Sequence, residues 1–479
     1  MDHDYKELCQ VFTPSTNAKE LLNWCDYTDK LNDKLVIENS CGNGKILEEV
    51  VARYIDDALK LGKNNTEIKK GLEENIYGIE YDFEKYTECI DNLNKITQRH
   101  GINNVMWKNI ICQDALKKIK CNKFDFVVGN PPYIKYSALA NNDREYIKKN
   151  FETCKRGKFD YCYAFIELSI KSLKKGGKMA YLIPSSIFKN VFAEDLREFI
   201  KPHLLKIYDY TTTKLFTKET NDERLTSSAI IILEKDSNQD YIEYIDITNK
   251  KNIKIAKKDL KDKWLFTNKM INNTKHQKRF GDYFKVSNTI ATLYNKAYVI
   301  KDYIENKDYV LINGCKIEKD ILKDTISPKN FDKHIKEKII FPYYYDENNN
   351  LVRYSEEEFS SKFKYAAEYL KSFEQLKNRK SDKSALWFEY GRSQALNNSN
   401  CPKLLLSTII TDKVKTKLLP EDNIPYSGLY ITVKKDKTLK EAEEILHSKE
   451  FFEYIKLKGI CASGNSFRIT ANDISEYRF

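Results

Sequence analysis

Residues 124–133, with the sequence Phe-Asp-Phe-Val-Val-Gly-Asn-Pro-Pro-Tyr, constrain the fold of this chain more than any other stretch. The apolar-rich first half predicts a buried strand. Proline cannot donate a hydrogen bond to a sheet and disfavours helix in the residue before it, so the strand must end at Asn130. A rigid polar turn therefore follows a strand tip, and strand tips at the carboxyl edge of an open α/β sheet are where ligands bind.

The turn offers a defined set of chemical groups. The side-chain oxygen of Asn130 and the carbonyl oxygen of Pro131 are neighbouring acceptors, which suit a planar –NH2 group with two donors. Tyr133 adds an aromatic face on which a base can stack. These groups predict a site for the exocyclic amine of a base or for an amide. A structural Pro-Pro turn with a packing tyrosine is the alternative.

A strand, a glycine loop and a helix are predicted earlier in the chain. Residues 34–38 are typical of a strand, residues 39–44 (Asn-Ser-Cys-Gly-Asn-Gly) of a tight loop, and residues 45–54 of a helix. Leu47 stands where a dinucleotide-binding fingerprint has its third glycine, so a nicotinamide cofactor is not favoured. Upstream, Thr13 is a candidate N-cap of another helix, whose first turn would attract an anion.

Acidic side chains follow the next two predicted strands. Glu80, with Asp82 as the second choice, ends a strand about 40 residues after the glycine loop, where a carboxylate can accept both hydroxyls of a ribose. Asp114 follows the strand predicted for residues 105–112 and is placed to accept an adenine amino group. An ordinary surface aspartate that begins a helix is an equal alternative for Asp114. The ordered series of strand tips is a stronger signal than any one of them.

Bulk properties favour a soluble globular protein in the cytoplasm. The 479 residues suffice for two or three domains, and no apolar run approaches the ~20 residues that span a bilayer. The start of the chain has no signal-peptide character. Its eleven cysteines form no Cys-x-x-Cys pair and do not cluster with the six histidines, which favours reduced thiols and no metal site.

The formal net charge of +11 is unevenly distributed. Residues 1–249 carry a net charge of −2 and residues 250–479 a net charge of +13. This asymmetry indicates a neutral catalytic half and a basic half that meets a polyanion such as nucleic acid. A lysine-rich composition can also be a solvated surface without a partner, and that reading stays open.

The motifs together resemble those of a known enzyme family. The order Phe-Thr-Pro, glycine loop, Gly-Ile-Glu-Tyr-Asp, Gln-Asp and Asn-Pro-Pro-Tyr is similar to that of DNA adenine-N6 methyltransferases of restriction–modification systems. It resembles their gamma arrangement, in which the cofactor motifs come first and a target-recognition domain comes last. The resemblance covers residues 8–235. It implies an α/β fold, with a Rossmann-like S-adenosylmethionine-dependent methyltransferase domain followed by a mixed α+β target-recognition domain.

The resemblance also implies roles for individual residues. The catalytic turn would consist of Asn130, Pro131 and Tyr133. The cofactor S-adenosylmethionine would be bound at its methionine end by Thr13, Glu38, Cys41 and Gly42, at its ribose by Glu80, and at its adenine by Asp114 and Pro132. The family's usual proline after the acidic residue of the glycine loop is Asn39 here.

Phe216 is the candidate for a second aromatic contact to the target base. In similar enzymes an aromatic residue before a late strand holds the base from the face opposite the tyrosine. The strand predicted for residues 227–233 is farther from Phe216 than expected, so an insertion near residues 218–224 is assumed. A core phenylalanine is the alternative.

The second half carries fewer signals. We predict a catalytic domain at residues 1–240 and a basic DNA target-recognition domain at residues 241–479. Aromatic, Arg, Gln and Asn side chains on glycine-containing loops are groups that read base edges and clamp phosphates. Arg392, Gln394 and Arg468 are therefore the predicted DNA contacts, with ordinary surface polar residues as the alternative.

The predicted function is site-specific adenine-N6 methylation of duplex DNA, in which the target base is flipped out of the helix. The closest alternative keeps the chemistry but acts on an RNA base or a protein glutamine, and it lacks a reason for the separate basic half. A fused nuclease is not expected, because the cofactor motifs begin near residue 11. Any restriction endonuclease partner is expected to be a separate chain or absent, and the protein is expected to be a monomer without a membrane partner.

Overall fold

The computed structural model describes residues 15–118, 122–210, 227–267, 278–333, 335–379, 381–463 and 465–479. Two predicted site residues, Thr13 and Phe216, lie outside the described residues. Contacts within the chain divide it into two compact units, Met1–Lys269 and Met270–Phe479. The predicted boundary at residue 240 differs from this division, because the sheet of unit 1 continues beyond residue 240.

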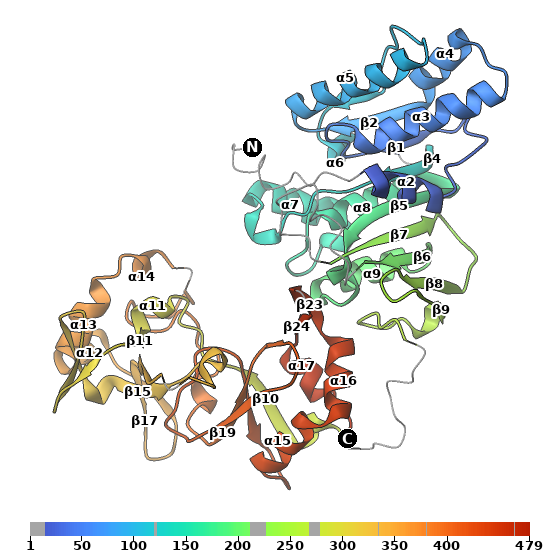
Figure 1. Cartoon of the computed structure of the whole chain (residues 1–479). Helices are drawn as coiled ribbons and strands as arrows, with labels where there is room; N and C mark the ends of the chain where they lie inside the picture. The colour runs from blue at the N-terminus through green and yellow to red at the C-terminus, as the bar shows by residue number, and fades with distance from the viewer. Residues whose placement is uncertain are drawn as a thin grey trace. The chain divides into compact units, whose positions relative to one another are not determined.

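Unit 1 is built on a nine-stranded sheet with the strand order β3-β2-β1-β4-β5-β7-β6-β8-β9 (Figure 1). The first five strands in this order are parallel to one another, whereas β7 is antiparallel to both of its neighbours. The strands are β1 (Val36–Glu38), β2 (Ile76–Glu80), β3 (Ile110–Cys112), β4 (Phe124–Gly129), β5 (Leu173–Pro184), β6 (Leu204–Asp209), β7 (Ser228–Glu234), β8 (Tyr241–Asp246) and β9 (Lys251–Ala256).

Helices cover both faces of this sheet. One core contains residues of α2 to α5 and the other contains residues of α6 to α9. Strand residues alternate between the two cores, as Val127 and Val128 of β4 show, because successive side chains of a strand point to opposite faces. The helices are α2 (Ser15–Trp24), α3 (Lys45–Lys60), α4 (Asn65–Asn75), α5 (Phe83–Arg99), α6 (Ala115–Lys118), α7 (Asn141–Asn150), α8 (Cys162–Ser172) and α9 (Glu194–Ile200).

The lysine-rich segment after residue 240 belongs to unit 1 rather than to a connection. Strand β8 pairs in parallel with β6, and β9 pairs with β8. Ile242 and Tyr244 are buried, and the Tyr244 hydroxyl donates to the Asp209 carboxylate at 2.7 Å. The apolar side chains at every second position therefore extend the sheet, and the lysines between them face solvent.

The polar segment after the Asn-Pro-Pro-Tyr turn is helical. A short 3-10 helix at Tyr136–Ala138 is followed by α7. Arg144 of α7 donates to the carbonyl oxygens of Tyr136 and Ser137 at 2.9 and 3.0 Å, and its guanidinium lies over the Tyr136 ring. These contacts, together with the buried Ile147, order the segment without a ligand.

Unit 2 combines several small sheets with helices, which confirms the predicted mixed α+β class. Its largest sheet has the order β10-β22-β19-β21. The strands are β10 (Phe284–Asn288), β11 (Val299–Ile300), β12 (Ile304–Glu305), β13 (Tyr309–Ile312), β14 (Cys315–Glu318), β15 (Leu322–Thr325), β16 (Glu337–Ile340), β17 (Tyr343–Tyr345), β18 (Leu351–Arg353), β19 (Lys403–Leu406), β20 (Ile409–Ile410), β21 (Thr416–Leu419), β22 (Leu429–Val433), β23 (Ile460–Ser463) and β24 (Ser466–Arg468).

Helices in two stretches of unit 2 are short and consecutive. Helix α12 is followed directly by α13, and α15 is separated from α16 by Ser448, whose hydroxyl accepts a hydrogen bond from the Phe451 amide and so caps α16. The helices are α10 (Phe280–Tyr283), α11 (Asn295–Tyr298), α12 (Glu356–Lys362), α13 (Lys364–Lys371), α14 (Gln375–Asn378), α15 (Leu439–His447), α16 (Lys449–Lys458) and α17 (Ala471–Ser475). Among the described residues of the whole chain, no helix has both the length and the apolar character needed to cross a bilayer.

Candidate functional site

Four parallel strands bring the predicted site residues of unit 1 to one edge of the sheet. The glycine loop follows β1, Glu80 ends β2, Asp114 follows β3, and Asn130 follows β4. Since these strands are adjacent and parallel, their carboxyl ends meet at the same edge. The predicted residues that the structure describes at these strand ends therefore lie along one edge of the sheet.

Glu80 connects its own strand end to the glycine loop. Its Oε2 accepts a hydrogen bond from the Gly42 amide at 2.8 Å, and its Oε1 accepts from the amides of Tyr81 and Asp82 at 2.9 Å each. Burial raises the pKa of the Glu80 carboxyl, while these three amides lower it by stabilising the charged form, and the net direction is upward. The carboxylate thus fixes the loop and leaves acceptor capacity for a ligand hydroxyl.

The glycine loop is a tight turn with a glycine at each of two positions of positive φ. The Gly44 amide donates to the Cys41 carbonyl oxygen at 2.8 Å, and the Cys41 amide donates to the Ile79 carbonyl oxygen at 3.0 Å. Gly42 and Gly44 have φ angles of +52° and +87°. A Cβ at Gly42 would meet no atom within 4 Å, so this side of the loop is open to a ligand.

Substitution of Gly44 by alanine is expected to destabilise unit 1 and weaken binding to the loop. The new Cβ would lie 2.7 Å from Cys89 Sγ, in addition to the cost of placing a non-glycine residue at this positive φ. Gly176→Ala is the matched control, because Gly176 has φ +73° and no atom within 4 Å of its Cβ position. The midpoint of thermal unfolding should fall more for Gly44→Ala than for the control; equal falls would contradict the packing argument.

Glu38 places an unsatisfied acceptor beside the loop. The side chain is 3% exposed, and its Oε2 has no hydrogen-bond partner among the described residues. Burial raises the pKa of this carboxyl well above its usual range, and the nearby Cys89 and Glu80 raise it further. A buried acceptor without a partner is costly, so this oxygen suits a donor group brought by a ligand. Cys41, also buried, lies in the same loop.

Asn130 is held from two sides at the end of β4. The Tyr133 hydroxyl lies 2.5 Å from Asn130 Oδ1 and 2.7 Å from the carbonyl oxygen of Leu182 in β5. Ser40 Oγ donates to the Asn130 carbonyl oxygen at 3.2 Å, which links the glycine loop to the Asn-Pro-Pro-Tyr turn. Burial raises the pKa of Tyr133 well above its usual range, so its hydroxyl keeps its proton.

Asp114 begins a helix in the structure, which agrees with the alternative interpretation of this residue. Its carboxylate accepts a hydrogen bond from the Leu116 amide at 3.0 Å and pairs with Lys117 at 3.1 Å, so it caps the short helix α6. Pro132 is half-buried in the turn after β4. Asp114 and Pro132 both remain at the carboxyl edge of the sheet, where the adenine of a cofactor is expected.

Two groups that support the site were not predicted. Asn39, which replaces the usual proline of the family, is 1% exposed; it donates to Ser169 Oγ at 2.9 Å and accepts from the Tyr181 hydroxyl. The two polar partners of Asn39 lie 130 and 142 residues away in the sequence, so no local pattern reveals them. Asp160 accepts from the Cys162 amide at 3.3 Å at the start of α8, and burial raises its pKa to about 6. The sequence Phe159-Asp160-Tyr161, which precedes an apolar helix, could have indicated this cap.

Two of the three residues predicted to contact DNA interact with other residues of unit 2. Arg392 pairs with Asp382 at 2.6 Å, and Gln394 Nε2 donates to the Thr289 carbonyl oxygen at 2.9 Å. Arg468 is exposed at the end of β24. Of the three, Arg468 is the side chain whose position best suits an external ligand.

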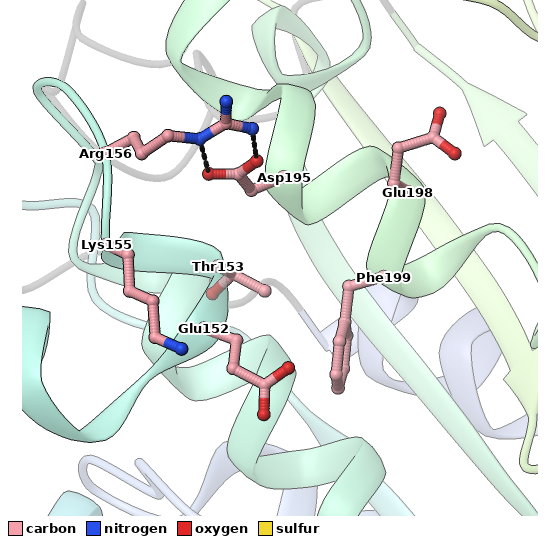
Figure 2. A pocket seen from close by; sticks show the side chains of 7 residues that line it. All are labelled: Glu152, Thr153, Lys155, Arg156, Asp195, Glu198 and Phe199. Atoms are coloured by element: carbon pink, nitrogen blue, oxygen red, sulfur yellow. Dashed lines mark hydrogen bonds and ion pairs between the residues drawn. The ribbon is translucent and has the colours of Figure 1, made fainter.

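A separate hollow of about 400 Å³ in unit 1 lies away from the strand tips (Figure 2). It lies between the 3-10 helix Glu152–Cys154, the following loop and α9, and it contains both acidic and basic side chains. Its most prominent pair, Arg156 and Asp195, is joined by two hydrogen bonds across the hollow. These charges neutralise one another, and they do not select a ligand of one sign.

Part of the chain is similar in sequence to known restriction–modification enzymes. Residues 44–216 match the sequence profile described as Eco57I restriction-modification methylase. The chain is 29% identical over 209 residues to the type II methyltransferase M.BstVI of Geobacillus stearothermophilus, covering 41% of this chain and 37% of that protein. It is 27% identical over 269 residues to the modification methylase CviBIII of Paramecium bursaria Chlorella virus NC1A, covering 54% and 60%.

The enzyme that shares the family name is similar over a longer stretch. The type II restriction enzyme and methyltransferase RM.Eco57I of Escherichia coli is 24% identical over 335 residues, which cover 61% of this chain and 33% of that protein. The chain therefore spans between a third and three fifths of the length of these three relatives.

A solved structure extends the likeness of the fold to both units. The DNA complex of the type IIL restriction-modification enzyme MmeI matches with a TM-score of 0.61 at 13% identity, covering 96% of this chain and 64% of that one. The DrdV–DNA complex matches with a TM-score of 0.55 at 12% identity, covering 90% and 49%. At these identities the likeness concerns the fold. The sequence match to the Eco57I restriction-modification methylase profile covers residues 44–216, which include Glu80, Asp114 and the Asn-Pro-Pro-Tyr turn, and this likeness agrees with the resemblance of the motifs.

Proposed function

We propose that this chain is a site-specific DNA adenine-N6 methyltransferase that uses S-adenosylmethionine, as the modification enzyme of a type II restriction–modification system or as an orphan enzyme. The observation that carries the proposal is the link between the two halves of the site. Ser40 of the glycine loop donates to the carbonyl oxygen of Asn130, so the cofactor loop and the catalytic turn form one unit. The relatives named above include type II methyltransferases, which supports a substrate in DNA.

The residues present fit the proposed cofactor. Glu80 is held by three amides in a position to accept ribose hydroxyls, and Glu38 Oε2 is a buried acceptor for the ammonium group of a methionine moiety. The open side of the loop at Gly42 leaves room for a ligand. When bound, S-adenosylmethionine supplies an electrophilic methyl group on a positively charged sulfur.

The catalytic turn would solve the main chemical problem of the reaction. The lone pair of the adenine amino group is delocalised into the ring, which makes the nitrogen a poor nucleophile. Hydrogen bonds from this group to Asn130 Oδ1 and the Pro131 carbonyl oxygen favour a pyramidal nitrogen and orient its lone pair. Catalysis is then mainly positioning and electrostatic stabilisation. The product loses its extra proton readily, so no general base is required.

The target adenine must leave the duplex to reach this turn, which costs ~ a few kcal/mol for unpairing and unstacking. Stacking on Tyr133 would offset much of this cost, since base–aromatic stacking contributes about 1–3 kcal/mol. Phe216 is the proposed partner on the opposite face of the base.

Two substitutions of Tyr133 are expected to separate its hydroxyl from its ring. Tyr133→Phe loses only the hydrogen bond to Asn130 or Leu182, so kcat should fall about 2–12-fold, the equivalent of roughly 0.5–1.5 kcal/mol. Tyr133→Ala also loses the stacking face and should be weaker by a further factor of about 10–100. The fluorescence of 2-aminopurine at the target position reports flipping. Equal defects in the two variants would refute a role for the ring.

Substrate class is tested with purified chain, labelled S-adenosylmethionine and three acceptors: mixed-sequence duplex DNA, structured RNA and a glutamine-containing peptide. The proposal predicts label on the N6 atom of adenine in duplex DNA. Label on RNA or on the peptide amide would transfer the same chemistry to another substrate and overturn the proposal.

A further inference from the structure

A hollow on unit 2, which we name the lysine groove, is separate from the predicted DNA contacts. It has a volume of about 640 Å³. Its lining includes four lysines, one aspartate and one histidine: Lys413, Lys415, Lys417, Lys449, Asp332 and His447. All six are exposed, so the groove presents its charged groups to solvent.

The groove forms where β21 and the loop before it meet the junction between α15 and α16. Thr416, the first residue of β21, has its Oγ1 2.6 Å from Glu443 Oε1 and 2.9 Å from His447 Nε2. These contacts join the strand to the end of α15. Val414, Leu446 and Phe452 supply an apolar floor beneath the charged rim. The rim therefore stands on packed elements, which hold the lysine backbones in place.

Positive charge is in excess in the lysine groove. Lys415 pairs with Asp332 at 2.5 Å. Within the described part of the chain, no ion pair is formed by Lys413, Lys417 or Lys449, and Asp332 is the single acidic residue of the lining. Three ammonium groups thus remain for an anion with several charges.

The groove adjoins the strand that carries Arg468. The Phe452 ring lies 6.0 Å from that of Phe467 in β24, and Thr411 and Ser466 share a hydrogen bond of 2.7 Å. Arg468 follows Phe467 in the same strand. Strand β24 therefore packs against α16, which contributes Phe452 to the groove.

We propose that the lysine groove binds the sugar–phosphate backbone of duplex DNA, through Lys413, Lys417 and Lys449. The proposal rests on the proposed function and adds the place on unit 2 where the backbone is held. An open rim of separated ammonium groups over an apolar floor matches a row of phosphates joined by sugars. Lysine contacts to phosphates set affinity and position but read no bases, so this site contributes binding that is independent of sequence.

The test is the salt dependence of DNA binding by the full chain with Lys413→Gln, Lys417→Gln and Lys449→Gln combined. The slope of log K against log [KCl] is negative, and each lost phosphate contact makes it less steep by about 0.9. The three substitutions should therefore reduce the steepness by roughly 2–3 and the affinity by about 10–100-fold at 100 mM KCl. Duplexes with and without the methylated site should lose affinity alike. Binding of S-adenosylmethionine should not change.

The matched control combines Lys307→Gln, Lys364→Gln and Lys383→Gln, three exposed lysines of unit 2 that do not line the groove. It removes the same net charge, so it should reproduce only the general electrostatic effect. If the unsubstituted chain methylates DNA, two results would overturn the proposal for the groove but not the proposed function. One is an equal loss of DNA affinity in both triple variants, and the other is no loss of DNA affinity in the groove variant. A chain that neither binds nor methylates duplex DNA would overturn the proposed function as well. If the groove variant lost affinity for RNA but kept its affinity for duplex DNA, this result would also contradict the proposal.

Discussion

Substitution of Asn130 by alanine is expected to reduce methyl transfer by at least about 10²–10³-fold, the range found when a preorganised polar group that stabilises a transition state is removed. The side-chain oxygen of Asn130 is proposed as one of two acceptors for the adenine amino group. The other, the Pro131 carbonyl oxygen, cannot orient the amine alone. The rate of a single turnover, measured with labelled S-adenosylmethionine on duplex DNA, reports the loss.

The same variant should bind S-adenosylmethionine as the unsubstituted chain does. The glycine loop is held by Glu80 and by its own turn, and Ser40 contacts the backbone oxygen at residue 130, which alanine retains. Asn142→Ala, at an exposed asparagine of α7, is the control. Undiminished transfer by Asn130→Ala would remove Asn130 from the mechanism. Lost cofactor binding would instead assign it a role in the loop.

Substitution of Glu80 by alanine is expected to abolish measurable binding of S-adenosylmethionine and to lower the midpoint of thermal unfolding. The carboxylate accepts hydrogen bonds from three amides, two of them partly buried, and the loss of each such bond costs about 0.5–1.5 kcal/mol. The variant also loses the acceptor proposed for the ribose hydroxyls. Titration calorimetry with S-adenosylmethionine and a thermal unfolding curve measure the two effects.

An isosteric variant separates the loop anchor from the charge. Glu80→Gln keeps an oxygen for the amides of Tyr81 and Asp82 but turns an NH2 group toward the Gly42 amide, which is a second donor. It should therefore bind the cofactor more weakly than the unsubstituted chain and be more stable than Glu80→Ala. Glu84→Ala, at an exposed position in the first turn of α5, is the control. Full cofactor affinity in Glu80→Ala would contradict the assigned role.

The strand-tip site could be predicted because its signals are local. Prolines ended β4 at Asn130, glycines allowed the positive φ angles after β1, and an acid closed β2. The parallel order of the strands then placed these tips on one edge. Local sequence could not reveal the network of Asn39 with Ser169 and Tyr181, because folding brings together residues that are far apart in the chain.

The predicted boundary of unit 1 came too early in the chain, because the lysine-rich composition after residue 240 was given more weight than the alternation of apolar residues there. The segment after residue 240 is rich in lysine, yet Ile242, Tyr244, Ile253 and Ile255 are buried at alternate positions. That period of two is typical of a strand with one face in a core. Reading the pattern would have extended the sheet to β9.

The details of unit 2 depended on contacts that sequence does not display. Arg392 and Gln394 resemble base-reading residues by type, but Asp382 and a backbone carbonyl already bind them. The lysine groove combines residues from the β21 region with the junction of α15 and α16, which are adjacent only in the fold. Charge counts located the basic half correctly but could not find a groove within it.

Modification-sensitive sequencing of DNA from a methylation-free host that expresses this chain tests the central claim most directly. The account predicts N6-methyladenine at one recurring short sequence, present with the unsubstituted chain and absent with Asn130→Ala. Unmodified host DNA, from cells in which the chain is folded and binds S-adenosylmethionine, would contradict the claim that DNA adenine is the substrate.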